Sequence, residues 1–145
     1  MRFLIQRVSR ASVRVEGREE ESIGGGVVVL IGIAAGDEQR HADYLADKLV
    51  NLRIFPDSEG KMNLSALDVR AELLLVSQFT LYGDCRKGRR PSFDAVAPPV
   101  EARRLYEYAV EKVKEKGLEV RTGVFQAHME VELINDGPVT LMLEY

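Results

Sequence analysis

The chain has 145 residues, 46% of them hydrophobic and 30% charged. This balance is typical of a folded, core-forming protein and excludes a disordered one. The net charge of −3 argues against a protein that coats nucleic acid nonspecifically, although a local basic patch is compatible with it. From the length we expect one domain spanning residues 1–145.

Membrane and metal classes are also disfavoured. The apolar run Val27–Ala35 is too short to cross a bilayer, and the charge at Arg7 interrupts any secretory signal. The single cysteine, Cys85, cannot form an internal disulfide, which suits a reducing cytoplasm. With only His41 and His128 beside it, no zinc-type ligand set can be assembled; magnesium is less firmly excluded. We therefore expect a cytoplasmic protein that needs no membrane, metal or cofactor.

The first half of the chain predicts strands around one helix. Residues 11–16 alternate apolar and polar side chains, the period of a half-buried strand. The run 27–35 follows three glycines and predicts a central strand covered on both faces. Asp37 is expected to cap a helix with one apolar face, which must end before Pro56. Residues 57–63 predict a turn.

The second half predicts one more helix and three more strands. The helix should begin at Pro98-Pro99, because proline suits a first turn, and stop by Gly117. The predicted strands are Leu73–Val76, Met129–Leu133 and Val139–Tyr145. Together these elements predict an α+β fold: a curved or barrel-like, mainly antiparallel sheet with two packed helices.

Familiar catalytic motifs are absent, but one polar segment ends a predicted buried strand. The sequence contains no GxSxG elbow, Walker loop or GxGxxG. The segment consists of Ser77, Gln78, Phe79 and Thr80. Hydroxyl and amide groups at a strand end are well placed to line a site on a rigid scaffold. The alternative is an ordinary strand end with Phe79 in the core.

A second candidate is the long aperiodic stretch from Thr80 to Pro99. Loops of this length in a compact domain are usually functional. The stretch holds a basic cluster in a net acidic chain, and such a cluster can bind phosphates. The alternative is a solvated loop. The cluster consists of Arg86, Lys87, Arg89 and Arg90.

The third candidate is the segment Asn135–Thr140, between two predicted strands. Asp136-Gly137 is a strong hairpin signal. Pro138 directly after it is unusual, because it removes an amide donor where the return strand should begin. An X-Pro bond is cis in about 10–30% of unfolded chains, and a fold can lock that form. The alternative is an ordinary tight turn, and the residues alone do not reveal the reaction.

At these motifs the chain resembles the D-aminoacyl-tRNA deacylase family. The resemblance rests on SQFTL at Ser77–Leu81 and NDGPVT at Asn135–Thr140. It extends to the opening LIQRVSRASV, the middle RIFPDSEGKMNLS, the RRPSF loop and TGVFQAHMEVELINDGPVT. Two motifs in order, with matching sequence between them, are far more specific than one.

The resemblance implies a homodimeric, cofactor-free enzyme that hydrolyses the ester between a D-amino acid and the 3′-terminal adenosine of tRNA. It implies that the catalytic segment of one subunit, residues 77–80, is completed by Gly137-Pro138 of the other. This bond would be cis, and its carbonyl oxygens would hold the substrate's amino group. Asn135 and Thr140 belong to the same substrate-binding motif, and Arg7 is assigned a supporting role. The basic cluster would then contact tRNA phosphates.

Two catalytic routes are compatible with these residues. Thr80 could be the nucleophile, but the sequence ties no histidine or lysine to it as an activating base. The alternative is a water molecule activated by the ribose 2′-hydroxyl, with backbone N–H groups near Phe79 stabilising the oxyanion. Ser77 and Gln78 would orient the ribose and the carbonyl. We favour the second route because the sequence offers no convincing general base.

Two classes of function other than the deacylase stay open, and the deacylase hypothesis itself has one further consequence. The chain could be a noncatalytic RNA-binding module or an esterase of free D-amino acid esters. If the chain is a deacylase whose Gly-Pro backbone rejects L-amino acids at their Cβ atom, glycine is not rejected, because it has no Cβ atom. We therefore expect glycyl-tRNA to be hydrolysed as well.

Overall fold

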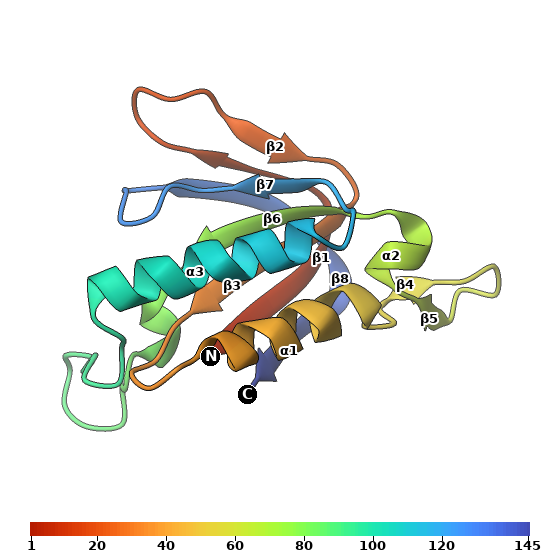
Figure 1. Cartoon of the computed structure of the whole chain (residues 1–145). Coiled ribbons are helices and arrows are strands. Elements are labelled where there is room, and N and C mark those ends of the chain that lie inside the picture. Colours follow the sequence, from red (N-terminus) through yellow and green to blue (C-terminus); the bar gives the residue numbers. More distant parts are fainter.

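The computed structural model describes all residues from 1 to 145 and contains eight strands and three α-helices (Figure 1). The strands are β1 (Arg2–Arg14), β2 (Glu21–Ile23), β3 (Gly26–Gly32), β4 (Phe55–Pro56), β5 (Met62–Leu64), β6 (Glu72–Ser77), β7 (Val120–Thr122) and β8 (Glu130–Glu144). The helices are α1 (Gln39–Asn51), α2 (Ala66–Val69) and α3 (Pro99–Lys114), with a 3-10 turn, η1 (Phe79–Tyr82), after β6.

Strand β1 is the centre of the main sheet. It pairs antiparallel with β2, β3 and β8. On the far side of β3 the pairing becomes parallel, first with β6 and then with β7. The sheet curves enough to bring β2 close to β7, although the two strands are not paired. The predicted α+β fold with a mainly antiparallel, barrel-like sheet is confirmed.

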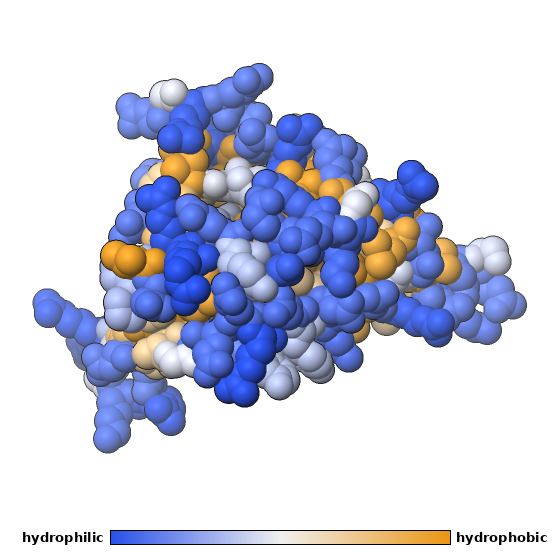
Figure 2. Space-filling model, viewed as in Figure 1, coloured by the Kyte–Doolittle hydropathy of each residue, from blue (hydrophilic) through white to orange (hydrophobic).

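The two faces of this curved sheet carry separate apolar clusters. Alternate residues of β6 point to opposite faces. Leu73 and Leu75 join a cluster of 23 buried residues beneath α1 and α3. Leu74 and Val76 join a cluster of seven on the inner, concave face. Strand β3 is buried on both faces, as predicted. The outward faces of α1 and α3 are mostly hydrophilic (Figure 2).

The two long helices match the predicted pair, and α3 starts at the Pro98-Pro99 step as expected. Helix α2 has four residues, too few to produce a periodic apolar pattern, and the sequence did not predict it. Of the predicted turn at residues 57–63, residues 57–61 connect β4 and β5, and the last two residues belong to β5. None of the helices combines the length and apolarity needed to cross a bilayer.

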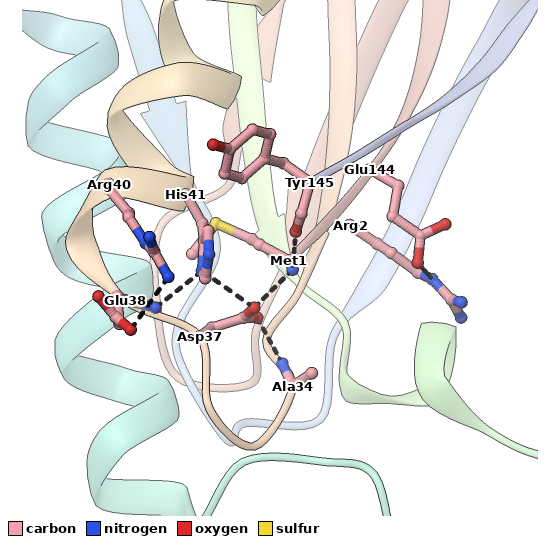
Figure 3. Close-up of polar contacts among 9 residues, drawn as sticks. All are labelled: Met1, Arg2, Ala34, Asp37, Glu38, Arg40, His41, Glu144 and Tyr145. Carbon is pink, nitrogen blue, oxygen red and sulfur yellow. Dashed lines mark hydrogen bonds and ion pairs between the residues drawn. The ribbon is translucent and has the colours of Figure 1, made fainter.

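The prediction that Asp37 caps α1 is wrong. Glu38 and His41 form the capping box instead. The Asp37 carboxylate is buried and lies 2.7 Å from the Met1 ammonium group (Figure 3). The same ammonium donates a hydrogen bond to the carbonyl of Tyr145 at 2.9 Å. A buried charge requires a partner, and this pairing fastens both ends of the chain to the start of α1.

The predicted hairpin at Asp136-Gly137 is also wrong. Strand β8 continues through this segment, and both of its halves pair with β1. Val8 of β1 lies opposite Asn135, and Gln6 lies opposite Thr140, so Arg7 alone faces the four residues 136–139. These four residues form a bulge, called here the Gly-Pro bulge. Proline is tolerated in it because a bulged residue has no ladder bond to lose.

Candidate active site

The predicted catalytic segment, residues 77–80, lies where buried strand β6 reaches the end of the sheet. Ser77 is opposite Ile31 of β3, and the backbone N–H of Gln78 donates to the Ile31 carbonyl at 2.8 Å. The chain then turns at once into η1. Phe79 is 55% exposed, so the alternative that placed it in the core is wrong. Thr80 is exposed as well, while Ser77 is half-buried.

The start of η1 supplies backbone donors. The first N–H groups of a helical turn have no partner within that turn, so those of Phe79 and Thr80 are left without a partner inside η1. The side-chain amide of Gln78 donates to the Thr80 hydroxyl oxygen. An amide nitrogen cannot accept a proton from that hydroxyl. The Thr80 hydroxyl therefore has no hydrogen-bond partner that could act as a base for a threonine nucleophile.

Supporting residues around η1 were not predicted from the sequence. A Cβ atom on Gly32 would lie 3.0 Å from Leu81 Cβ and 3.2 Å from the Gln78 carbonyl oxygen, so a side chain here would crowd η1 against β3. Arg2 donates to the Leu81 carbonyl at 2.9 Å and lies 4.4 Å from the ring centre of Tyr82. Burial raises the pKa of Tyr82 to about 12, so its phenol stays neutral. The one signal in the sequence was a glycine inside an apolar strand.

After η1 the chain forms a closed loop, residues 84–92, called here the basic loop. Asp84 and Ser92 exchange two backbone hydrogen bonds of 2.8 and 3.0 Å at its neck. The Asp84 carboxylate also accepts two side-chain bonds from Arg86, at 2.9 and 2.7 Å. Hydrogen bonding to Arg86 lowers the pKa of Asp84 to about 2. The remaining basic side chains of the loop are exposed and form no ion pair: Lys87, Arg89 and Arg90.

The Gly-Pro bulge is held by side chains of its own strand and of β1. The Gly137–Pro138 bond is cis, as predicted, and both residues are exposed. Asn135 donates from its amide nitrogen to the carbonyls of Arg7 and Val139, at 3.0 and 3.1 Å. Val139 is buried, and exposed Thr140 returns the chain to the ladder. The bulge thus exposes its backbone to solvent, while the hydrogen bonds of Asn135 hold it in place.

Arg7 is the buried support of this bulge. Its side chain is 9% exposed, and Nη2 donates to the Gly137 carbonyl at 3.4 Å. Nη1 donates to the carbonyl of Ile54, and Nε lies 2.8 Å from an oxygen of Asp136. These contacts fix the guanidinium between β1 and the bulge. Arg7 thus lies where the sequence led us to expect a residue that supports the Gly-Pro bulge.

The catalytic segment and the Gly-Pro bulge do not meet within the chain. Ser77 is level with Ile31 and therefore with Phe3 of β1, whereas the bulge faces Arg7. Measured along the surface of the sheet, three strand spacings and four residues amount to a separation of about 20 Å. The predicted site residues thus form two groups, one at the end of β6 with the basic loop and one on β8.

The two main hollows of the surface lie away from the catalytic segment. Two hollows of about 300 and 400 Å³ share Arg18 and the end of β7, residues 122–124. Gly123 donates to the carbonyl of Leu75, so this end of β7 lies beside β6. Neither hollow is lined by the catalytic segment or the bulge. No three His, Cys, Asp or Glu side chains gather in a way that could hold a metal.

Comparison with known protein families assigns this α+β chain to a class of tRNA deacylases. The chain belongs to the D-Tyr-tRNA(Tyr) deacylase family, whose model matches residues 4–144. This confirms the family that the sequence motifs indicated.

Individual relatives match over nearly their whole length. A protein of Heliobacterium modesticaldum named D-aminoacyl-tRNA deacylase is 62% identical, with 99% of this chain and 96% of the relative covered. A protein of the same name from Geotalea daltonii is 60% identical, with the same coverage. The solved structure of a c-Myc DNA Unwinding Element Binding Protein is 40% identical, with a TM-score of 0.92 over 100% of this chain and 99% of that one. A probable eukaryotic D-amino acid tRNA deacylase, 19% identical with a TM-score of 0.85, shares the fold over 98% of this chain and 97% of that one.

Proposed function

We propose that this chain hydrolyses the ester bond of D-aminoacyl-tRNA and releases a D-amino acid and free tRNA. The observation that carries this function is family membership over residues 4–144, together with relatives of that name at about 60% identity. The noncatalytic RNA-binding module and the esterase of free D-amino acid esters are not favoured. The proposal includes a cytoplasmic location, where tRNA is charged.

We further propose that two copies of the chain share each active site. The separation of about 20 Å between the catalytic segment and the Gly-Pro bulge supports this, because one chain cannot bring both to one substrate. Strand β8 also exposes apolar side chains, as an interface between copies would require. Those at least 37% exposed are Val131, Ile134, Leu141 and Met142.

In this site the catalytic segment handles the ester. Water adds to the carbonyl carbon while the ribose 2′-hydroxyl takes its proton, and the N–H groups of Phe79 and Thr80 bind the resulting oxyanion. The C–O bond then breaks, and the 3′-oxygen leaves with the proton relayed by the 2′-hydroxyl. Ser77 and Gln78 orient the ribose and the carbonyl. No protein side chain has to accept a proton, which suits a segment whose threonine contacts only an amide.

The Gly-Pro bulge handles the amino group of the substrate. The carbonyl oxygens of Gly137 and Pro138 accept hydrogen bonds from the α-ammonium group. An L-amino acid held this way drives its Cβ atom into the backbone, and no rotamer relieves a clash at that atom. A D-amino acid directs its side chain outward, and glycine has no Cβ atom. Asn135, Thr140 and Arg7 keep the carbonyls in place, while Lys87, Arg89 and Arg90 contact tRNA phosphates.

The test is a deacylation assay with four esters side by side at limiting enzyme. D-tyrosyl-tRNA and glycyl-tRNA should be hydrolysed, while L-tyrosyl-tRNA and free D-tyrosine ethyl ester should survive. Binding of charged tRNA without release would support the RNA-binding module, and rapid cleavage of the free ester would support the esterase. If glycyl-tRNA survives as long as the L-ester, the site recognises the D-side chain directly, and exclusion by the backbone is wrong.

A further inference from the structure

An exposed aromatic pair connects the catalytic segment to the basic loop, and the chemistry above gives the rings no role. Phe79 is 55% exposed and Phe93 is 38% exposed. Their ring centres are 5.1 Å apart, with the ring planes at 61°, an edge-to-face arrangement. Phe79 begins η1, whereas Phe93 follows the neck of the basic loop. Two distant segments thus meet to present aromatic surface to solvent.

The ring of Phe93 is supported from below. A Cβ atom on Gly83 would lie 3.0 Å from Phe93 Cε1, so the ring rests directly on the backbone at the end of η1. Gly83 is fixed in turn by a 2.9 Å hydrogen bond from its N–H to the Thr80 carbonyl. Phe93 also accepts a backbone bond from Val96 at 3.0 Å. The ring is therefore an ordered platform and not a loose side chain.

We propose that Phe93 stacks on an unpaired base of the tRNA 3′ end, the one that precedes the terminal adenosine. This inference rests on the proposed function and names a further substrate contact of the same site. Single-stranded nucleic acid is bound by aromatic faces that stack on bases beside cations that contact the backbone. Phe93 has both neighbours: the catalytic segment through Phe79, and the unpaired cations of the basic loop.

The order of these features along the surface selects the base. The esterified adenosine must lie at residues 77–80, where Phe79 is located. Phe93 is the next aromatic surface, 5.1 Å further on, and it adjoins the neck at Ser92. A strand leaving the ester therefore passes Phe93 before its phosphates reach Arg89 and Arg90. In this arrangement the terminal adenosine lies on one side of the Phe79 ring, and the preceding nucleotide lies on the other side, against Phe93.

The main test compares Phe93→Leu with Phe93→Tyr. Leucine keeps an apolar contact with Gly83 and Phe79 but has no aromatic face, whereas tyrosine keeps that face. We expect Phe93→Leu to raise KM for D-tyrosyl-tRNA at least about 5-fold with kcat unchanged, and Phe93→Tyr to match the wild type. Met62→Ala is the matched control, because Met62 is 57% exposed in the β4–β5 hairpin, at the opposite end of the molecule from the basic loop (Figure 1).

A minimal substrate separates stacking from other roles. 3′-O-D-tyrosyl-adenosine lacks the preceding nucleotides, so Phe93→Leu should hydrolyse it as fast as the wild type does. Uncharged tRNA with pyrrolocytidine at the penultimate position should be quenched by the wild type and by Phe93→Tyr, but not by Phe93→Leu. An equal loss on both substrates, or quenching that Phe93→Leu retains, would overturn the inference. Wild-type protein that cleaves neither substrate would overturn the proposed function instead.

Discussion

The end of β6 and the Gly-Pro bulge of β8 are built in opposite ways. The segment after β6 presents N–H donors and polar side chains from a short turn, packed on Gly32 and tied by Arg2. The bulge presents carbonyl acceptors from a break in a long strand, stapled by Asn135 and Arg7. Donors suit a developing oxyanion and acceptors suit an ammonium group. In the proposed site the two regions are complementary halves, and one strand, β1, supports both.

The largest expected effect comes from damaging one half at a time. A Cβ atom on Gly137 would meet only the Asn135 side chain, at an ordinary 3.7 Å, so Gly137→Ala should fold normally. It should nevertheless lose at least about 100-fold in kcat/KM, because the added methyl group displaces the substrate's amino group. Gln78→Ala, in the other half, is expected to lower activity as well.

Mixing the two variants tests whether the halves belong to different copies. If subunits exchange freely, mixed dimers contain one intact site and should restore about a quarter of the wild-type activity. Thermal unfolding of each variant is the control. Activity that stays at the level of the separate variants would place the whole site in one chain and contradict the shared arrangement.

The two supporting arginines of β1 should differ in what they control. Arg7 contacts the Gly137 carbonyl, whereas Arg2 contacts the Leu81 carbonyl and the Tyr82 ring. Lysine keeps the charge but loses the planar, forked donors. Arg7→Lys should lower kcat/KM about 10-fold and reduce the ratio of D- to L-tyrosyl-tRNA hydrolysis. Arg2→Lys should lower kcat and leave that ratio unchanged. If the two variants change the D- to L-tyrosyl-tRNA ratio equally, the two arginines do not control different properties.

A smaller effect is expected at Thr80. If the ribose 2′-hydroxyl assists water, Thr80→Ala loses one hydrogen bond, about 0.5–1.5 kcal/mol, and the rate should fall about 2- to 10-fold. Loss of a nucleophile would cost several orders of magnitude instead. Single-turnover kinetics give the rate, and mass spectrometry after rapid quenching searches for an acyl-enzyme. An acyl group found on Thr80 would decide against the ribose-assisted route.

The smallest effect concerns the basic loop, which contacts neither the ester nor the amino group in the proposed site. Replacing Arg89 and Arg90 by Ala should reduce the salt dependence of tRNA binding by about 0.7 to 0.9 in slope for each lost phosphate contact. The control is Lys48→Ala with Lys61→Ala, which removes the same charge from exposed positions outside the loop. If the two double variants show equal salt dependence of tRNA binding, the basic loop is only a solvated surface loop.

The sequence predicted local features well and long-range pairing poorly. The buried strand before Ser77 and the proline start of α3 were predictable because each depends on neighbouring residues. The hairpin at Asp136-Gly137 was wrong because local turn chemistry cannot reveal that β1 is long enough to pair with both flanking segments. The cap at Asp37 was wrong because its carboxylate serves Met1, which is distant in sequence.

The Gly-Pro bulge also has a consequence for the outer, unpaired edge of β8. This strand has 15 residues and pairs only with β1, so its other edge exposes backbone N–H and C=O groups. A long, flat, apolar edge is a template for uncontrolled strand addition and aggregation. Pro138 has no N–H to offer there, and the bulge divides the edge into two short stretches. The residues proposed to choose between D- and L-amino acids therefore also interrupt the edge at which a strand of another copy could add.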